Sequence, residues 1–166
     1  MALTHRPIAM ETDKDIVLQL HCLANYEGDP AWFRGESLED YRSAWFATPQ
    51  PAAFLARLAA PIDDPKAVVE VWEEDGRLVG YVCVSFLELE GYPIVVAEVE
   101  DIAVLPAYQR QGIGTEMLTY AEAEARVRGA GVLRADIGVA NAASKALHER
   151  QGFAVFRQSY EKRLES

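Results

Sequence analysis

The chain has 166 residues, 50% of them hydrophobic, with 26 acidic and 16 basic side chains and a formal net charge of −10. This balance argues against nucleic-acid binding, because phosphate contacts require a basic face; it would attract cationic small molecules, although excess acid also simply keeps many proteins soluble. No apolar run approaches the ~20 residues that span a bilayer, and residues 1–7 lack the apolar core of a signal peptide. We therefore expect a cytoplasmic protein that has no membrane partner.

Length and cysteine content predict one domain with a reduced interior. A chain of this size suits a single domain, residues 1–166, around one core. Cys22 and Cys83 lie in an apparent helix and an apparent strand, without metal-ligand spacing. We expect both to be reduced core residues, and we expect no metal site.

The first part of the chain predicts a strand and a helix. Residues 6–10 form a short apolar segment typical of a strand. Thr12 or Asp13 then provides the N-cap of a helix, followed by acidic residues that suit the helix dipole.

Glycine and proline interrupt the helical pattern over residues 25–35, which predicts a loop. The loop carries Tyr26 and Trp32. Aromatic side chains in such a loop either cover the core or line a ligand pocket, because loops on rigid scaffolds often determine specificity. Tyr26 and Trp32 are therefore candidates for contacting a substrate.

Two further helices precede a change of period. Residues 37–40 resemble a capping box that opens a second helix, and residues 52–60 are compatible with a short third one. Strands are then predicted over residues 68–72 and 78–86, joined by a hairpin turn centred on Asp-Gly. A long strand follows over residues 94–105.

This long strand leads into a glycine-containing turn and a helix over about residues 112–130. Pro106 cannot continue a ladder, and the apolar positions after the turn recur at helical spacing. Gly112 and Gly114 allow a ligand to approach the backbone closely, and the free N–H groups of a helix's first turn bind phosphate oxygens. With Arg110 at its rim, the turn is predicted to hold a pyrophosphate.

Two other phosphate-binding motifs do not fit this turn. A P-loop needs a lysine that the segment lacks, and a dinucleotide fingerprint needs a third glycine where the chain has Met117. The remaining pattern is Gln-x-x-Gly-x-Gly over residues 109–114, for which a glycine turn without a ligand is the alternative interpretation. Beyond it, the sequence predicts a strand over 133–139, a helix over 141–150 and one or two strands over 152–164.

The pattern over residues 109–114 resembles the acetyl-CoA-binding motif of the GNAT superfamily of N-acetyltransferases. Residues 141–153, an asparagine and a helix followed by Gly-Phe, resemble the second signature of that family, and the resemblance is strong over residues 80–153. It implies a single-domain α/β fold with a mixed, mostly antiparallel sheet of six or seven strands and about four flanking helices. A splayed pair of parallel strands would hold the cofactor. Residues 1–65 would then form the acceptor side and residues 66–166 the cofactor-binding core.

The resemblance also implies an activity, which is direct transfer of the acetyl group of acetyl-CoA to a primary amine in a ternary complex. The acidic balance favours a small cationic acceptor such as a polyamine, an aminoglycoside or an amino-acid derivative. The residues that would contact acetyl-CoA, its pantetheine arm or its pyrophosphate are Ile102, Ala103, Val104, Gln109, Arg110, Gln111, Gly112, Ile113, Gly114, Thr115, Asn141 and Ser144.

Two carboxylates precede the glycine turn. An amine must lose a proton to become a nucleophile, so a carboxylate near the acceptor is useful. Strand alternation predicts Glu98 and Glu100 on one face with Ile102 and Val104, whereas Asp101 would face away and cap or pair. By position, Glu98 matches the base of histone-acetylating members and Glu100 an acid of polyamine-acetylating members.

His148 occupies the position at which the family commonly has a tyrosine that protonates the departing thiolate. A histidine titrates near neutrality and could donate as imidazolium, or it could pack or contact the cofactor while water serves as the acid.

The histidine in place of the usual tyrosine leaves open a catalytically idle acetyl-CoA-binding or sensor module of the same fold, and an unrelated α/β binding protein is a third interpretation. A peptide or protein acceptor also remains an alternative. A homodimer would be ordinary for the family.

Overall fold

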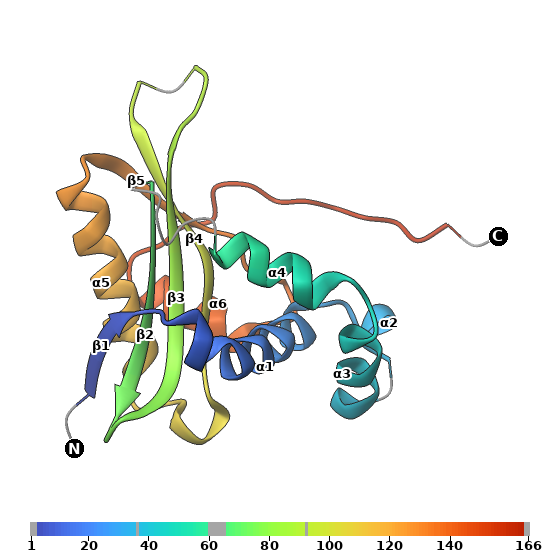
Figure 1. Cartoon of the computed structure of the whole chain (residues 1–166). Coiled ribbons are helices and arrows are strands. Elements are labelled where there is room, and N and C mark those ends of the chain that lie inside the picture. Colours follow the sequence, from blue (N-terminus) through green and yellow to red (C-terminus); the bar gives the residue numbers. More distant parts are fainter. Residues whose placement is uncertain (1–2, 36, 60–65, 92, 165–166) are drawn as a thin grey trace.

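A mixed sheet forms the centre of the structure (Figure 1). The computed structural model describes residues 3–35, 37–59, 66–91 and 93–164. In these residues five strands follow the order β1-β2-β3-β4-β5, antiparallel except for the parallel pair β4 and β5. The strands are β1 (Leu3–Pro7), β2 (Ala67–Glu74), β3 (Arg77–Glu88), β4 (Val95–Val104) and β5 (Ala130–Ala135).

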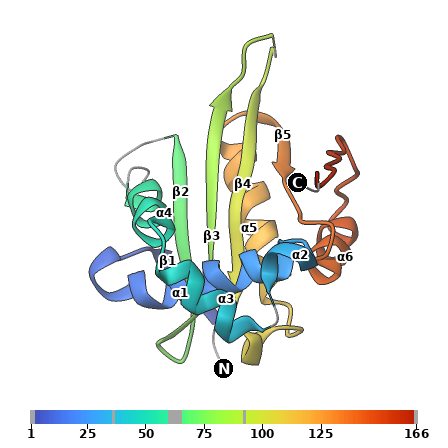
Figure 2. The ribbon, with the colours of Figure 1, turned by 90° about the vertical axis from the view of Figure 1, so that its right-hand side faces the viewer.

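Helices cover both faces of this sheet (Figure 2). Helices α1, α3 and α4 enclose one hydrophobic cluster, and α5 encloses a second cluster on the opposite face. None of the helices in the described ranges is both long and apolar enough to cross a membrane. The helices are α1 (Met10–Gly28), α2 (Ala31–Arg34), α3 (Leu38–Phe46), α4 (Gln50–Ala59), α5 (Ile113–Val127) and α6 (Ala142–Arg150), with a 3₁₀ turn η2 (Pro106–Tyr108) between β4 and α5.

The predicted α/β class, the mostly antiparallel sheet and the order of its main elements are confirmed. The Asp-Gly hairpin is present, with both Asp75 and Gly76 at positive φ, as a tight two-residue turn requires. Ser37 caps α3, since its Oγ accepts the N–H of Asp40 at 3.1 Å. Cys22 and Cys83 are both free and buried, as expected of core residues.

The predicted start of the first helix is wrong. The strand before it is β1, which ends earlier than expected, and α1 begins at Met10 with Ala9 at the N-cap. The carboxylate of Asp13 lies one turn inside the helix and reaches back to accept the N–H of Ala9 at 2.8 Å. Arg6 donates to the same carboxylate at 2.7 and 3.0 Å. Asp13 therefore acts as a cap from within the helix and fixes β1 against it.

The described residues form five strands, fewer than the six or seven predicted. They form six α-helices, more than the four or so predicted, because the short α2 and α4 are added. Residues 152–164 account for the missing strands, because they contain no strand within the described range. Figure 1 shows this C-terminal segment running away from the sheet. Val155, Phe156 and Tyr160 are more than half exposed. Their spacing suits a strand, but a strand also needs a neighbouring backbone to bond to.

A β-bulge in β4 changes which side chains share a face. Asp101 lies opposite Cys83, whereas Val99 lies opposite the next residue of β3, so Glu100 is an extra residue in the ladder. Because of this insertion, Ile102 joins Val99 in the cluster beneath α5. The predicted grouping of Glu98 and Glu100 with Ile102, opposite Asp101, is therefore wrong. Asp101 points to the α1 face.

The parallel strands β4 and β5 separate part-way along their length. They pair from Val95 with Ala130 to Val99 with Ala135, where β5 ends, while β4 continues to Val104. This confirms the predicted splayed parallel pair, although β5 ends earlier than the sequence indicated. One edge of β4 therefore lacks a neighbouring strand beyond Val99 in the described structure, which creates the opening that the site occupies.

Candidate active site

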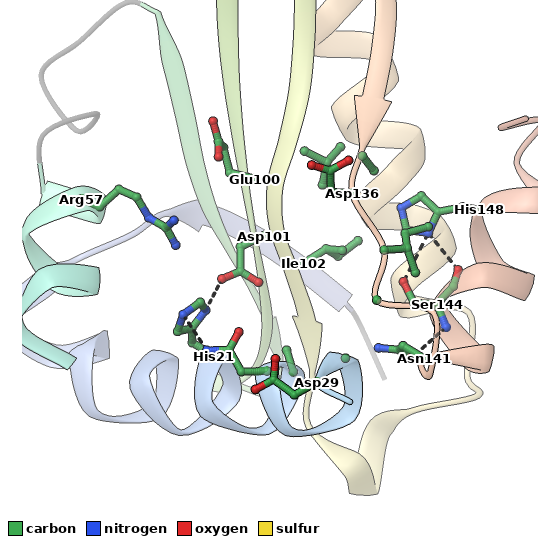
Figure 3. A pocket seen from close by; sticks show the side chains of 17 residues that line it. His21, Asp29, Arg57, Glu100, Asp101, Ile102, Asp136, Asn141, Ser144 and His148 are labelled. Atoms are coloured by element: carbon green, nitrogen blue, oxygen red, sulfur yellow. Dashed lines mark hydrogen bonds and ion pairs between the residues drawn. The ribbon is translucent and has the colours of Figure 1, made fainter. Parts of the chain in front are cut away.

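A cavity of about 350 Å³ lies where β4 and β5 separate (Figure 3). Side chains from α1, α4, β4, the segment after β5 and α6 converge on it. The polar and charged residues among them are His21, Asn25, Asp29, Arg57, Glu100, Asp101, Asp136, Asn141, Ser144 and His148. Ile102 also lines the cavity.

Four carboxylates line this cavity, and Arg57 brings a guanidinium to the same rim. Asp29 is held by the hydroxyl of Tyr41, which donates to its Oδ2 at 2.8 Å. Burial, and then the charge and hydrogen bond of Asp29, raise the pKa of Tyr41 well above its ordinary range. Ser85 donates its hydroxyl to Glu100 at 2.6 Å. The walls therefore present fixed negative charge to a ligand.

Asp101 is the best-held of these carboxylates. Its Oδ2 accepts hydrogen bonds from the Nδ1 of His21 and, at 2.7 Å, from the hydroxyl of Tyr81. The His21 ring stacks on Phe54 with the ring centroids 3.7 Å apart and the planes 6° from parallel. Tyr81 is fully buried, and burial together with the charge of Asp101 raises its pKa well above the ordinary value. The tyrosine stays protonated and acts only as a donor.

Glu98 and Glu100 differ in their positions. Glu100 lines the cavity, whereas Glu98 is absent from the lining and lies next to β5, opposite Arg134 in the strand register. Burial, followed by the charges of Glu100 and Asp136, raises the pKa of Glu98. The structure thus brings Glu100 and Asp101 to the cavity, and Glu98 only to its flank.

His148 lies on the opposite side of the cavity from His21 (Figure 3). It is 2% exposed, and its Nδ1 donates to the carbonyl of Ser144 at 2.8 Å. Its Nε2 is buried and has no hydrogen-bond partner among the described residues. Burial lowers the pKa of His148, so the ring is neutral near pH 7 with an accepting Nε2. This geometry opposes the predicted role of His148 as a proton donor.

Asn141 and Ser144, both predicted to contact the cofactor, begin the helix that carries His148. The Oδ1 of Asn141 caps α6 by accepting the N–H of Ser144 at 2.9 Å. Both residues line the cavity on the side facing Ile102.

The glycine turn forms the predicted helix entrance. Gly112 is the N-cap of α5 with φ +91°, and Arg110 has φ +66°. No acceptor is found in the described structure for the N–H groups of Ile113 and Gly114, which begin the helix. The Ile113 side chain is buried, so only its backbone is available to a ligand. These free donors at the positive end of a 15-residue helix suit phosphate oxygens.

The neighbouring glutamines hold this turn in place. Gln109 donates its side-chain amide to the carbonyl of Val104 at 3.1 Å, and Gln111 donates to that of Ala107 at 3.2 Å. At Gly114 an added Cβ would lie 2.9 Å from the side chain of Leu147. The second glycine of the motif therefore also permits α5 and α6 to pack closely.

Comparison with known proteins decides the family. Residues 32–153 match the model of the acetyltransferase (GNAT) family, which is more than half of the chain. The chain belongs to the GNAT acetyltransferase family. It is therefore an acyltransferase, and its co-substrate is acetyl-CoA. Within the described residues, no cluster of three acidic, histidine or cysteine side chains has the geometry to hold a metal ion.

Relatives of this GNAT chain act on different amines. It is 30% identical over 149 residues to an N-alpha-acetyltransferase of Sulfurisphaera tokodaii, covering 86% of this chain and 75% of that protein. It is 32% identical over 103 residues to an aminoglycoside N(6')-acetyltransferase type 1 of Klebsiella aerogenes, covering 61% and 68%. The fold matches that of AAC(6')-Iy in complex with the bisubstrate analogue CoA-S-monomethyl-acetylneamine, with a TM-score of 0.69, 16% identity and full coverage of both chains.

The two aromatic residues predicted to contact a substrate from a loop, Tyr26 and Trp32, both belong to helices. Tyr26 lies within α1, not in a loop, and its ring packs against Tyr41 with centroids 5.4 Å apart. It is not among the residues that line the cavity. Trp32 belongs to the short α2, and its side chain lies outside the described part of the structure.

Sequence reasoning missed His21, Asn25, Asp29 and Asp136. Only one signal was available for the first of these. His21 follows the buried Val17 by one helical turn, so it lies on the face of α1 that packs against the sheet. A histidine on a buried helix face needs a polar partner, which Asp101 supplies.

Proposed function

We propose that this chain transfers the acetyl group of acetyl-CoA directly to the primary amine of a small acceptor that carries more than one positive charge. The observation that carries the proposal is the set of four carboxylates around one cavity, at the point where β4 and β5 separate. The carboxylates are those of Asp29, Glu100, Asp101 and Asp136.

The cavity suits a small cation in both charge and size. Arg57 is the sole cationic side chain in the described lining, apart from the histidines, so the carboxylates outnumber it. The volume of about 350 Å³ lies at the lower end of the range for small-molecule sites, roughly 300–1,000 Å³. The four carboxylates would pair with several ammonium groups of one acceptor at once.

The two relatives suggest the two acceptor classes to compare. One is named for N-alpha acetylation and the other for acetylation of an aminoglycoside. An α-amino group at the end of a peptide brings one positive charge to the site, whereas an aminoglycoside or a polyamine brings several. The number of carboxylates favours the second class for this chain.

The acetyl-CoA side of the proposal rests on backbone groups. The edge of β4 at Ile102, Ala103 and Val104, which has no neighbouring strand in the described structure, would bond to the pantetheine arm, and the start of α5 would bind the pyrophosphate. The thioester would then face the carboxylates from the α6 side, near Asn141 and Ser144. Bound acceptor and thioester would meet in the cavity, as direct transfer requires.

An acceptor panel tests the proposal. Release of free CoA would be followed with kanamycin, spermidine, 1,3-diaminopropane and a short peptide with a free N-terminal alanine. We expect kcat/KM to be highest for the multiply charged amines and to fall as salt is added, because exposed charge pairs are screened. Turnover of the peptide alone would contradict the small-amine acceptor. Binding of acetyl-CoA without any turnover would support an idle sensor module instead.

A matched pair of variants tests the carboxylates. Asp136→Asn preserves shape and removes one charge from the cavity, whereas Asp15→Asn removes a charge from the exposed part of α1, outside the lining. We expect Asp136→Asn to raise KM for a polyamine by roughly tenfold while the Kd of acetyl-CoA stays the same. Equal effects of the two variants would contradict a local role for the cavity charge.

A further inference from the structure

We propose that His21, oriented by Asp101, is the base that takes a proton from the acceptor ammonium. The inference rests on the proposed function and names a residue for one of its steps. The pair joins helix α1 to strand β4 across eighty positions of the chain. Figure 3 places it on the α1 side of the cavity, facing the α6 residues across the space.

The ring of His21 is held in one orientation. Its side chain is 13% exposed and that of Asp101 is 10% exposed. Phe54 stacks on one face of the ring, and Trp45 lies at a centroid distance of 5.9 Å. The short contact between Nδ1 and Oδ2 fixes the ring edge. A base held between a stacking ring and a largely covered carboxylate is pre-oriented for proton transfer.

The hydrogen bonds assign the tautomer. A carboxylate accepts, so the Nδ1 of His21 carries the proton and its Nε2 keeps a lone pair that can accept one. Nε2 lies 3.1 Å from the side-chain amide of Asn25, which also lines the cavity. The second oxygen of Asp101, Oδ1, accepts no hydrogen bond from the described residues. The pair therefore presents a basic nitrogen and an open carboxylate oxygen on the acceptor side.

The other candidate bases fit this step less well. Glu98 lies outside the cavity lining, and Glu100 is bonded by Ser85 at the exposed bulge. Asp136 is exposed and has no partner that would orient it in the described structure. His148 lies on α6, across the cavity from His21, and its Nδ1 is bonded to the Ser144 carbonyl of its own helix. An imidazole is also the side chain whose ordinary pKa lies nearest neutrality, which suits a general base.

The acceptor ammonium replaces the Asn25 amide as the donor to Nε2, its N–H bond breaks, and a new N–H bond forms on Nε2. The imidazolium is stabilised by the carboxylate of Asp101, which keeps its charge. The neutral amine attacks the thioester carbonyl, the C–S bond breaks, and a second amine proton leaves with the thiolate to give the free thiol. His21 then returns its proton to solvent.

Charged or titratable groups from several elements share the cavity with His21 or contact its partner Asp101. They are Asp29 of α1, Arg57 of α4, Tyr81 of β3, Glu100 and Asp101 of β4, and Asp136 after β5, while α3 packs on the ring with the apolar face of Trp45. A pH profile of one variant therefore has to be compared with that of a matched variant outside this group.

The test uses His21→Gln, with His5→Gln as the matched control on β1, where the ring stacks on Trp72. The acceptors are 1,3-diaminopropane and its 2,2-difluoro derivative, whose amines are less basic. We expect His21→Gln to lower kcat/KM for the parent diamine by roughly 100-fold, in line with general-base catalysis. The loss for the difluoro derivative should be several-fold smaller, because more of that amine is already neutral. The wild type should show a rise of kcat/KM with pH, and in His21→Gln this rise should move to higher pH.

Three results separate the possible failures. A folded His21→Gln with wild-type kcat/KM contradicts the base alone, and so does an equal loss for both acceptors with an unchanged pH profile, which a structural role would produce. A wild type that binds acetyl-CoA but acetylates no amine contradicts the proposed function and the base with it. Thermal unfolding and acetyl-CoA titration of each variant establish that it is folded. Tyr81→Phe provides a second test, since losing one hydrogen bond to Asp101 should lower kcat/KM by less than about tenfold.

Discussion

The proposed acetyl-CoA site and the proposed acceptor site, here called the acetyl-CoA side and the acceptor side, are built in opposite ways. The acetyl-CoA side would consist of backbone groups from one continuous segment, the end of β4 through the first turn of α5. The acceptor side consists of side chains from α1, α4, β4 and the segment after β5, which are far apart in the sequence. The first side depends on where glycines allow the chain to turn, and the second on which charged side chains the packing brings together.

This difference has a functional consequence. Backbone N–H groups can bind a pyrophosphate whatever side chains surround them, so that side can stay the same while the acceptor changes. The acceptor side can change its charge by single substitutions on helices that pack against the sheet. Acetyl-CoA affinity and acceptor preference should therefore respond to different mutations, which can be tested one region at a time.

The largest effect is expected for Gly112→Asp on the acetyl-CoA side. Gly112 has φ +91°, where a side chain is strained, and an aspartate would also bring a negative charge to the phosphate donors of α5. We expect acetyl-CoA affinity, measured by calorimetry, to fall on the order of 100-fold or more.

Gly76→Asp is the matched control for this substitution. Gly76 also has positive φ, +77°, and has no atom within 4 Å of an added Cβ, but it lies in the β2–β3 hairpin. We expect this variant to lose some stability and to keep its affinity for acetyl-CoA. If both variants bind acetyl-CoA as the wild type does, the phosphate site lies elsewhere.

The second prediction concerns the contact between α1 and the segment after β5. An added Cβ on Gly138 would lie 2.3 Å from the carbonyl oxygen of Gly28, whereas one on Gly28 would lie 3.9 Å from Gly138. Gly138→Ala must therefore push the end of α1 away and shift Asp29 and Asn25. We expect it to lower stability by about 1–3 kcal/mol and kcat/KM by roughly tenfold, with little change in acetyl-CoA affinity.

Gly28→Ala tests the direction of that contact. Its added Cβ would lie at an ordinary van der Waals distance from the Cα of Gly138, and alanine favours a helix. Stability and kcat/KM should therefore stay near the wild-type values. Urea unfolding and steady-state kinetics of both variants provide the comparison. Equal losses in the two would mean that the close approach does not position the acceptor side.

The same contrast explains what the sequence could predict. The segment over residues 109–114 is local, because a strand, a proline, two glycines and a helix follow one another along the chain. Their spacing was enough to predict the turn and the positive end of α5, whereas the splayed strands were implied by the resemblance to the GNAT family. No knowledge of distant residues was needed for this region.

The acceptor side depends on a strand irregularity and on long-range contacts that no local sequence pattern reveals. The bulge at Glu100 reverses the alternation of β4, so Asp101 enters the cavity although a regular strand would turn it away. His21 becomes its partner only because α1 crosses the end of β4. Tyr26 looked like a loop residue because Gly28 and Pro30 follow it, yet α1 continues to Gly28. The outcome in each case was decided by tertiary packing.

A third prediction uses the buried histidine of α6. The pKa of His148 is lowered in the folded protein by burial, while in the unfolded chain it keeps its ordinary value of 6.5. As pH falls below 6.5, the unfolded state therefore takes up a proton before the folded state does. The free energy of unfolding should decrease by up to about 1.4 kcal/mol per pH unit from this group, until pH reaches the lowered folded pKa.

His148→Gln should remove this part of the pH dependence. Denaturant unfolding between pH 7.5 and pH 5 should give a shallower slope for the variant than for the wild type. An unaltered slope in His148→Gln would mean that the ring takes up its proton as readily in the folded protein as in the unfolded chain. That result would favour the imidazolium donor that its position in the family suggests.

The smallest effect is expected for Ser37→Ala, which removes a helix cap next to the acceptor side. Ser37 caps α3, and α3 carries Tyr41, whose hydroxyl fixes Asp29 at the cavity. Loss of the cap should lower the free energy of unfolding by about 1 kcal/mol. Ser43→Ala, at an exposed position within the same helix, should leave it unchanged or slightly raise it. If α3 holds Asp29 through Tyr41, Ser37→Ala should also raise the acceptor KM slightly while acetyl-CoA affinity stays constant. A parallel loss of acetyl-CoA affinity would show that the two sides of the cavity are energetically coupled, and would contradict their independence.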